Sequence, residues 1–184
     1  IDGNGVTLTK YVGNAVDVYI PSSITVNGYT YSVEKLADGL FEDNDVINSV
    51  TLGSGIDEIG DRAFYDCDNL VCILLNEDLK SIGDEAFYSC DAFNSVIIYK
   101  AIQTIGADAF AQCPNVVIWC SADTVGFNYA IASGLKYELM NTSIGTPETF
   151  EINGLTYYVQ DGAAYLIDCA DGLTDVIVPA TSPN

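Results

Sequence analysis

The segment Ile-Gly-Asp-Arg-Ala-Phe at residues 59–64 returns twice further along the chain. Close copies begin at residues 82 and 105, so that successive copies start 23 residues apart (82 − 59 and 105 − 82). Self-similarity at one fixed period of about 20 to 50 residues is the signature of a stacked repeat array. In such a solenoid each repeat packs on its two neighbours, and long open surfaces take the place of an enclosed cleft. The period therefore predicts the architecture before any single residue is considered.

The apolar residues of each period fall at the same places in three consecutive units. In the unit from residue 64 to residue 87 these places are held by Phe64, Cys67, Leu70, Ile73, Leu75, Leu79, Ile82 and Phe87. Two apolar residues that lie two apart, such as Ile73 and Leu75, point to the same face of a strand. The segments at 50–52, 73–75 and 96–98 therefore predict short strands, which stacking would join into a parallel sheet with about 4.8 Å between neighbours.

A Gly-Asp pair follows the second apolar pair of each unit, as at Gly60 and Asp61. Aspartate is one of the preferred N-cap residues of helices, so residues 62–65 are expected to form about one turn of α- or 3-10 helix. Gly60 is expected in a tight bend, where a Cβ would be unfavourable. The predicted fold is an α/β solenoid with parallel strands on one face and short helical turns on the other.

Both ends of an array need a cap, because a terminal unit has only one neighbour. At the C-terminal end residues 127–133 are followed by Gly134, which is typical of a helix with a glycine stop, and residues 135–139 predict a closing strand. The predicted organisation is a β-rich flank (1–32), the array with its cap (33–140), a linker (141–149) and the β-rich start of a further module (150–184).

The two ends of the chain share a second, longer repetition. The Val-Tyr-Ile-Pro segment at 18–21 resembles Val-Ile-Val-Pro at 176–179, which lies 158 residues later (179 − 21). One interpretation is that the chain holds one module and the start of the next, within a longer protein. The other is that the tail folds back and caps the array by itself. The first interpretation is favoured, and both are kept.

The charge of the chain excludes several classes of partner. There are 26 acidic and six basic residues, for a formal net charge of −20, and there is no histidine. Such an acidic surface repels phosphate groups, which argues against nucleic acid and against anionic membranes as partners. No apolar run is long enough to insert into a membrane. Because histidine is the commonest general base and metal ligand, we expect no enzymatic activity, no metal site and no cofactor.

Three cysteines, Cys67, Cys90 and Cys113, also follow the 23-residue period. Stacked at one inward position, neighbouring Cα atoms would lie about 5 Å apart, which allows a disulfide. The other interpretation is that cysteine serves here as a small buried hydrophobe, and free thiols are favoured on that ground. Metal binding is not expected, because thiolates in a straight row do not form a tetrahedron.

The complete repeat at residues 79–98 resembles the BspA-like leucine-rich repeat family. It carries Leu79, Ile82, Gly83, Asp84, Ala86, Phe87, Cys90, Phe93, Val96 and Ile98. The likeness covers residues 33–139, with departures at Asn44, which replaces the repeat cysteine, and at Ala107, which replaces the aspartate. The resemblance implies a leucine-rich repeat fold in a large modular protein that is secreted or attached to the cell surface. It also implies a role in adhesion to host proteins or to other cells.

The outward positions of the strands are the default binding surface of a solenoid. They are expected to be Ser49, Thr51, Cys72, Leu74, Ser95 and Ile97, with Tyr99 and Trp119 nearby. Leu74 and Ile97 would be adjacent, and an exposed apolar stripe of this kind fits a protein or glycan partner on a host or neighbouring cell. The alternative is that residues 1–32 or the tail cover this face. The second functional hypothesis is a purely structural spacer in a surface protein.

Overall fold

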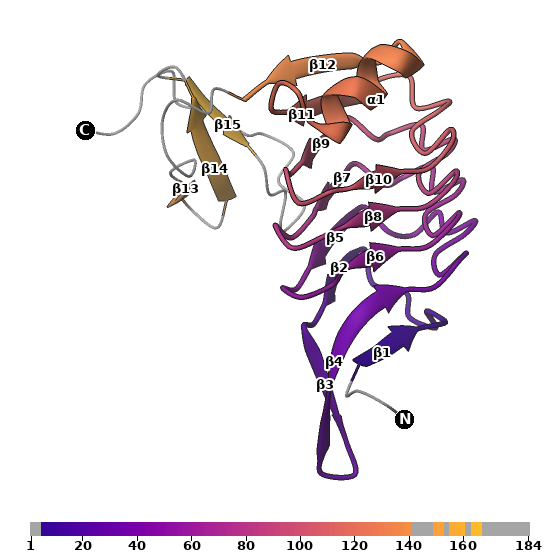
Figure 1. The fold of residues 1–184 in the computed structure, drawn as a ribbon. Helices are drawn as coiled ribbons and strands as arrows, with labels where there is room; N and C mark the ends of the chain where they lie inside the picture. Colours follow the sequence, from indigo (N-terminus) through magenta and orange to yellow (C-terminus); the bar gives the residue numbers. More distant parts are fainter. Residues whose placement is uncertain (1–4, 141–148, 153–154, 161–162, 167–184) are drawn as a thin grey trace.

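The structure is a computed structural model that describes residues 5–140, 149–152, 155–160 and 163–166. Residues 5–140 form a solenoid whose 23-residue units, the rungs, stack along one axis, with a helix at one end and a hairpin at the other (Figure 1). The segment at 176–179, Cys169 and all but the last residue of the predicted linker at 141–149 lie outside the described residues. The proposed domain boundaries therefore stay predictions.

One parallel sheet, the first sheet, carries the predicted strands. Its order is β12-β11-β9-β7-β5-β2. The strands are β2 (Asp17–Ile20), β5 (Ser49–Leu52), β7 (Cys72–Leu74), β9 (Ser95–Ile98), β11 (Val117–Cys120) and β12 (Lys136–Leu139). Val50 pairs with Ile73 and Val96 pairs with Ile118, and all four side chains are buried. The alternation read from the sequence is thus confirmed.

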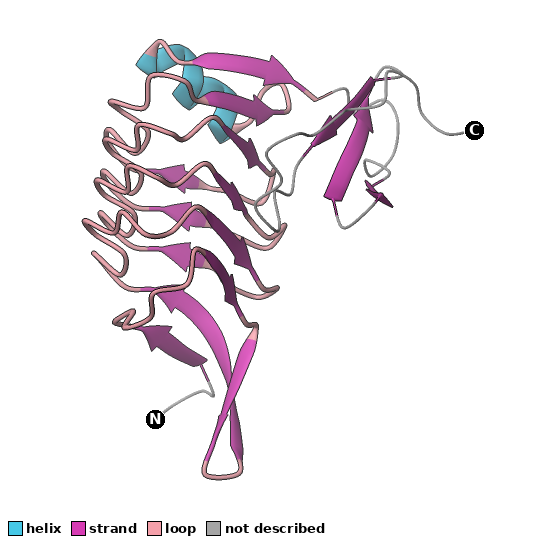
Figure 2. Cartoon of the chain, turned by 180° about the vertical axis from the view of Figure 1, so that it is seen from behind, coloured by secondary structure: helices cyan, strands magenta, loops and turns pink. Residues whose placement is uncertain are grey.

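A second parallel sheet runs along the solenoid and was not predicted. It has the order β1-β4-β6-β8-β10, and β3 pairs antiparallel with β4 to form the end hairpin. The strands are β1 (Gly5–Leu8), β3 (Ser23–Val26), β4 (Tyr29–Leu36), β6 (Glu58–Ile59), β8 (Ser81–Ile82) and β10 (Thr104–Ile105). The two-residue strands are too short to show an alternation, and the sheet arises only when stacking brings Ile59 into register with Ile82. Figure 2 shows both sheets as rows of arrows joined by loops.

The expected helical turn at residues 62–65 is instead a pair of tight turns. Arg62 and Asp66 have positive φ angles of 55°, a left-handed conformation that a helix does not contain. The backbone N–H of Arg62 donates to the carbonyl of Asp84, and that of Phe64 donates to the carbonyl of Ala86. Hydrogen bonds between rungs replace those within a helix. The solenoid itself is as predicted.

The repeat aspartate links two rungs and does not cap a helix. The backbone N–H of Asp84 donates to Oδ1 of Asp61 at 2.8 Å, and the N–H of Ala107 donates to Oδ1 of Asp84 at 2.7 Å. Asp38 accepts from Asp61 in the same way. Ala107 ends this row, because the cap helix follows it in place of another rung. Alanine stands here in place of the repeat aspartate, whose carboxylate would have no further rung to bind.

The repeat glycine allows the backbones of two rungs to approach closely. A Cβ added to Gly83 would lie 2.5 Å from the backbone nitrogen of Asp61, and one added to Gly106 would lie 2.4 Å from that of Asp84. Real Cβ contacts are not this short, and neither glycine has a positive φ angle. The prediction that a Cβ is unfavourable is confirmed, but the cause is the neighbouring rung and not the bend.

A ladder of stacked phenylalanine rings runs through the core. The ring centroids of Phe41, Phe64, Phe87 and Phe110 follow one another at 5.0, 5.0 and 5.1 Å. At the ends, the ring of Tyr11 lies 4.9 Å from that of Phe41, and the ring of Tyr129 packs edge-on 5.9 Å from that of Phe110. The Tyr129 hydroxyl also accepts the backbone N–H of Phe110, which has no further rung to bind. Both ends of the aromatic core are thus closed by a tyrosine.

The predicted cap is confirmed. Helix α1 (Val125–Ser133) begins after Thr124, whose hydroxyl accepts the backbone N–H of Phe127. It ends at Gly134, which has a φ of 66° and donates its N–H to the helix carbonyls. Strand β12 then pairs parallel with β11 as the closing strand. Further along, β13 (Thr149–Ile152), β14 (Leu155–Gln160) and β15 (Ala163–Leu166) form an antiparallel sheet of their own.

Candidate interaction surface

The outward side of the first sheet carries a row of uncharged side chains, the outer row. It consists of Tyr19, Thr51, Leu74, Ile97 and Trp119. Tyr19 pairs with Thr51, Thr51 with Leu74, and Ile97 with Trp119. Leu74 and Ile97 each lie two residues beyond a paired couple, Cys72 and Ser95, so the same register makes them neighbours. The outer row therefore crosses five strands without a break.

A second outward row consists of Ser49, Cys72, Ser95 and Val117. Ser49 is only 7% exposed and Cys72 only 9%, so these two predicted contact residues offer almost no accessible area. The hydroxyl of Ser49 donates to a carboxylate oxygen of Asp17 at 2.5 Å, while that of Ser95 bonds to the side chain of Asn94. Because its hydroxyls are already bonded within the chain, this row contributes less to a contact surface than the sequence suggested.

Charge is absent from the middle of this face. Strands β5, β7, β9 and β11 contain no Asp, Glu, Lys or Arg, although the chain as a whole has a net charge of −20. The charged residues of the sheet stand at its two ends, on β2 and β12, as Asp17, Lys136 and Glu138. An uncharged patch within a strongly acidic surface is where apolar contact with a partner would require the least removal of water from ions.

The two predicted aromatic residues lie at the border of this face. Trp119 is half-buried on β11, in register with Ile97 on one side and Glu138 on the other. Tyr99 directly follows β9 and packs partly against the core. Its burial, and then the nearby Glu77, raise the pKa of Tyr99 above its ordinary value, so the phenol stays neutral.

Sequence reasoning missed one member of the outer row, Tyr19, which is 65% exposed on β2. This strand falls within the predicted flank, where the 23-residue pattern is irregular. The available signal was the Val-Tyr-Ile alternation at 18–20, which places Tyr19 outward between two inward residues. The outer row therefore begins one strand earlier than predicted.

A second group that the sequence did not reveal lies on the turns. The rings of Tyr65 and Tyr88, which are 23 residues apart, stack at 5.2 Å with an interplanar angle of 4°. The guanidinium of Arg62 lies 3.8 Å above the Tyr65 ring and forms ion pairs with Glu42 and Glu85. The hydrogen bond that Arg62 donates to the carboxylate of Glu42 raises the pKa of Arg62, which stays charged. Exact spacing of the two tyrosines was the signal that could have predicted the stack.

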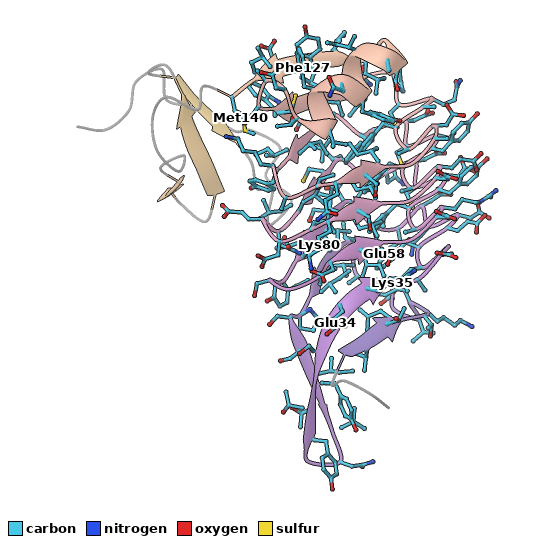
Figure 3. The ribbon with its side chains drawn as sticks, in the orientation of Figure 1. Glu34, Lys35, Glu58, Lys80, Phe127 and Met140 are labelled. Atoms are coloured by element: carbon cyan, nitrogen blue, oxygen red, sulfur yellow. The ribbon has the colours of Figure 1, made fainter. Side chains whose placement is uncertain are left out.

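Ion pairs also join the rungs on the second sheet. Nζ of Lys35 lies 2.6 Å from Glu58, and both residues are labelled in Figure 3. Nζ of Lys80 lies 2.6 Å from Asp57. The hydrogen bond with Glu58 raises the pKa of Lys35. Within the residues that the structure describes, no group of three or more His, Cys, Asp or Glu side chains is placed to hold a metal ion. None of the described helices has the length and apolarity required to cross a bilayer.

The cysteine ladder consists of buried free thiols, as favoured from the sequence. The thiols of Cys67, Cys90 and Cys113 donate to backbone carbonyls of the preceding rung at 3.1, 3.1 and 2.9 Å. Cys120, which lies outside the ladder, is also a buried free thiol. Burial raises the pKa of Cys67 to about 12. A thiol that stays protonated and is closed off from solvent is a packing group and not a nucleophile.

Several solved structures share this architecture. A leucine-rich repeat protein from Bacteroides capillosus is 29% identical, over 61% of this chain and 85% of that one, with a TM-score of 0.55. A leucine-rich repeat protein from Bacteroides ovatus is 23% identical, over 70% and 34%, with a TM-score of 0.53. One from T. pallidum is 24% identical, over 63% and 64%, with a TM-score of 0.51. None of the curated proteins compared with the chain matches it.

The repeat itself identifies the family. The model of the BspA type leucine-rich repeat region matches residues 17–126 in six copies, which is more than half of the chain. The matched segment begins at β2 and extends into α1, so it spans every strand of the first sheet except the closing strand β12. The chain therefore belongs to the BspA-type leucine-rich repeat family.

Proposed function

We propose that this chain is a non-enzymatic recognition module of a secreted or surface-attached protein, and that the outer row contacts a protein or glycan partner. The observation that carries the proposal is the uncharged face of β5, β7, β9 and β11 on a chain of net charge −20. Membership of the BspA-type repeat family supports the extracellular location. The acidic charge argues against nucleic acid as a partner.

The chemistry of the outer row fits a contact surface. Aromatic residues dominate the energetics of interfaces, and the row offers Tyr19 and Trp119 at its two ends with Leu74 and Ile97 between them. Truncating an anchor of this kind typically weakens binding by about 2 kcal/mol, or roughly 30-fold. A flat row without charge fits an apolar protein surface or the apolar face of a sugar.

An enzymatic function has little support in the described residues. The chain has no histidine, and its ladder thiols are buried and bonded to carbonyls. The carboxylates at the repeat aspartate position accept hydrogen bonds from the next rung, as at Asp61 and Asp84. These side chains therefore have structural roles, which favours the non-enzymatic interpretation.

The test replaces Ile97 by glutamate and compares this variant with Ile131→Glu. Ile131 is 53% exposed on α1 and provides the same chemical change away from the outer row. Fluorescently labelled protein is added to epithelial cells and to bacterial cells, and bound label is measured by flow cytometry. We expect Ile97→Glu to reduce binding at least about tenfold and Ile131→Glu to leave it unchanged. Circular dichroism confirms that both variants are folded.

The second hypothesis is a structural spacer. It draws support from the unbroken hydrogen bonds between rungs and from the tyrosines that close both ends of the aromatic ladder. A spacer needs no partner, so the wild-type protein would then bind neither kind of cell. Equal binding by wild type and Ile97→Glu would also count against the outer row.

A further inference from the structure

The turns of the four successive rungs form a strongly acidic edge, called the turn edge. It comprises residues 38–45, 61–68, 84–91 and 107–114, which contain four, three, three and one acidic residues. Against these eleven carboxylates stands one basic residue, Arg62. Desolvation and the neighbouring carboxylates of Asp66 and Asp91 raise the pKa of Asp68, as expected where like charges crowd. The turn edge therefore attracts cations.

The chain itself shows how this edge binds a cation. Arg62 stacks on the ring of Tyr65 and forms ion pairs with Glu42 and Glu85. Tyr88 covers the other face of Tyr65, because two rings with centroids 5.2 Å apart leave no room for a guanidinium between them. A planar cation over an aromatic ring, held by carboxylates at its rim, is a favourable arrangement for arginine.

The next rung presents the same ring, Tyr88, and no arginine or lysine from the described part of the chain lies over it. One face of Tyr88 is stacked on Tyr65, while on the side of its other face the following rung carries Ala111 where a third ring would stand (88 + 23). Asp108 is exposed in that rung at the place equivalent to Arg62 and Glu85 (62 + 46 and 85 + 23). At one end of the stack the guanidinium of Arg62 covers Tyr65. At the other end one face of Tyr88 lies beside the short side chain of Ala111 and the carboxylate of Asp108.

We propose that the turn edge binds a basic segment of a partner protein, one arginine of which stacks on Tyr88 above Ala111 and pairs with Asp108. Arginine fits better than lysine because its guanidinium is planar and can stack and donate two hydrogen bonds at once. This surface is distinct from the outer row, which carries no charge. The inference therefore stands whether or not the outer row binds a partner.

The probes are two fluorescein-labelled peptides, one with four arginines alternating with glycine and one with lysine in place of each arginine. Binding is measured by fluorescence anisotropy at low ionic strength. We expect the arginine peptide to bind about three- to tenfold more tightly than the lysine peptide. Tyr88→Ala should abolish this preference and Asp108→Asn should reduce it. Tyr29→Ala, which removes a 70% exposed tyrosine from the end hairpin, should leave it intact. Equal affinity for the two peptides, or an equal effect of Tyr88→Ala and Tyr29→Ala, overturns the proposal.

A gain of binding separates the proposal from a loss of fold. Arg62→Ala removes the internal guanidinium and opens the second face of Tyr65 beside Glu42 and Glu85. The variant should show a larger preference for the arginine peptide than the wild type does. A gain that is equal for both peptides reflects only the more negative net charge and overturns the proposal.

Discussion

The hydrogen bond between the repeat aspartates can be tested at Asp61. Its Oδ1 accepts the backbone N–H of Asp84 at 2.8 Å. Both Asp61→Ala and Asp61→Asn remove one negative charge from the acidic turn edge, but only the alanine variant also removes the acceptor. The difference between the two variants therefore isolates the hydrogen bond from the relief of charge repulsion.

The magnitude follows from the position of this bond. A hydrogen bond to a charged acceptor contributes about 1.5–3 kcal/mol when buried, and about 0.5–1.5 kcal/mol when both partners are neutral. Asp61 and Asp84 are exposed, and the asparagine is neutral, so about 1 kcal/mol is expected between the two variants. With a urea m-value of about 2 kcal/mol per molar, the alanine variant should unfold at about 0.5 M less urea than the asparagine variant.

The assay is urea unfolding followed by circular dichroism at pH 7. Ala107→Asp serves as the control, because position 107 ends the row and has no further rung to bind. It should change the free energy of unfolding by less than about 0.5 kcal/mol. Equal midpoints for Asp61→Ala and Asp61→Asn would refute the inter-rung role of the aspartate.

Three further predictions concern the core. Phe87→Ala should lower the free energy of unfolding by about 3–5 kcal/mol in urea titrations, because the ring is fully buried between Phe64 and Phe110. A loss below about 1 kcal/mol would contradict the ladder. Gly83→Ala should cost at least about 2 kcal/mol in the same assay, since its Cβ would lie 2.5 Å from backbone. Burial raises the pKa of the Cys67 thiol to about 12, so the folded protein holds this proton more tightly than the unfolded chain does. Its contribution to stability should therefore be lost as pH rises from the pKa of a free thiol, about 8.5, toward 12, and thiol reagents at pH 8 should label it only after unfolding.

The parts of the fold that were predictable are those encoded within one rung. Alternation over three residues is enough to place Val50 and Leu52 inward, and Gly134 is enough to end a helix. The turns were not predictable in this way. An aspartate before a possible helix looks like a cap, and only stacking shows that the donor it binds belongs to the next rung, 23 residues away. The second sheet could not be predicted either, because its strand pairs also form only between stacked rungs.

The candidate surface was predictable to a similar extent. Alternation along the strands indicated Leu74 and Ile97, but it could not show that Ser49 and Cys72 are buried, because burial depends on neighbours in space. Tyr19 lies before the first regular repeat and was passed over. The stack of Tyr65 on Tyr88 was hidden among residues that the apolar template leaves free to vary.

The outer row as the contact surface can be tested most directly by photo-crosslinking. A photoreactive amino acid replaces Thr51, in the middle of the outer row, and in a second variant replaces Gln103, an exposed residue just before β10 of the second sheet. Each labelled protein is bound to cells and irradiated, and crosslinked products are separated by size. Position 51 should give a crosslink to a cell-surface component and position 103 should not. A crosslink from position 103 alone would contradict the account.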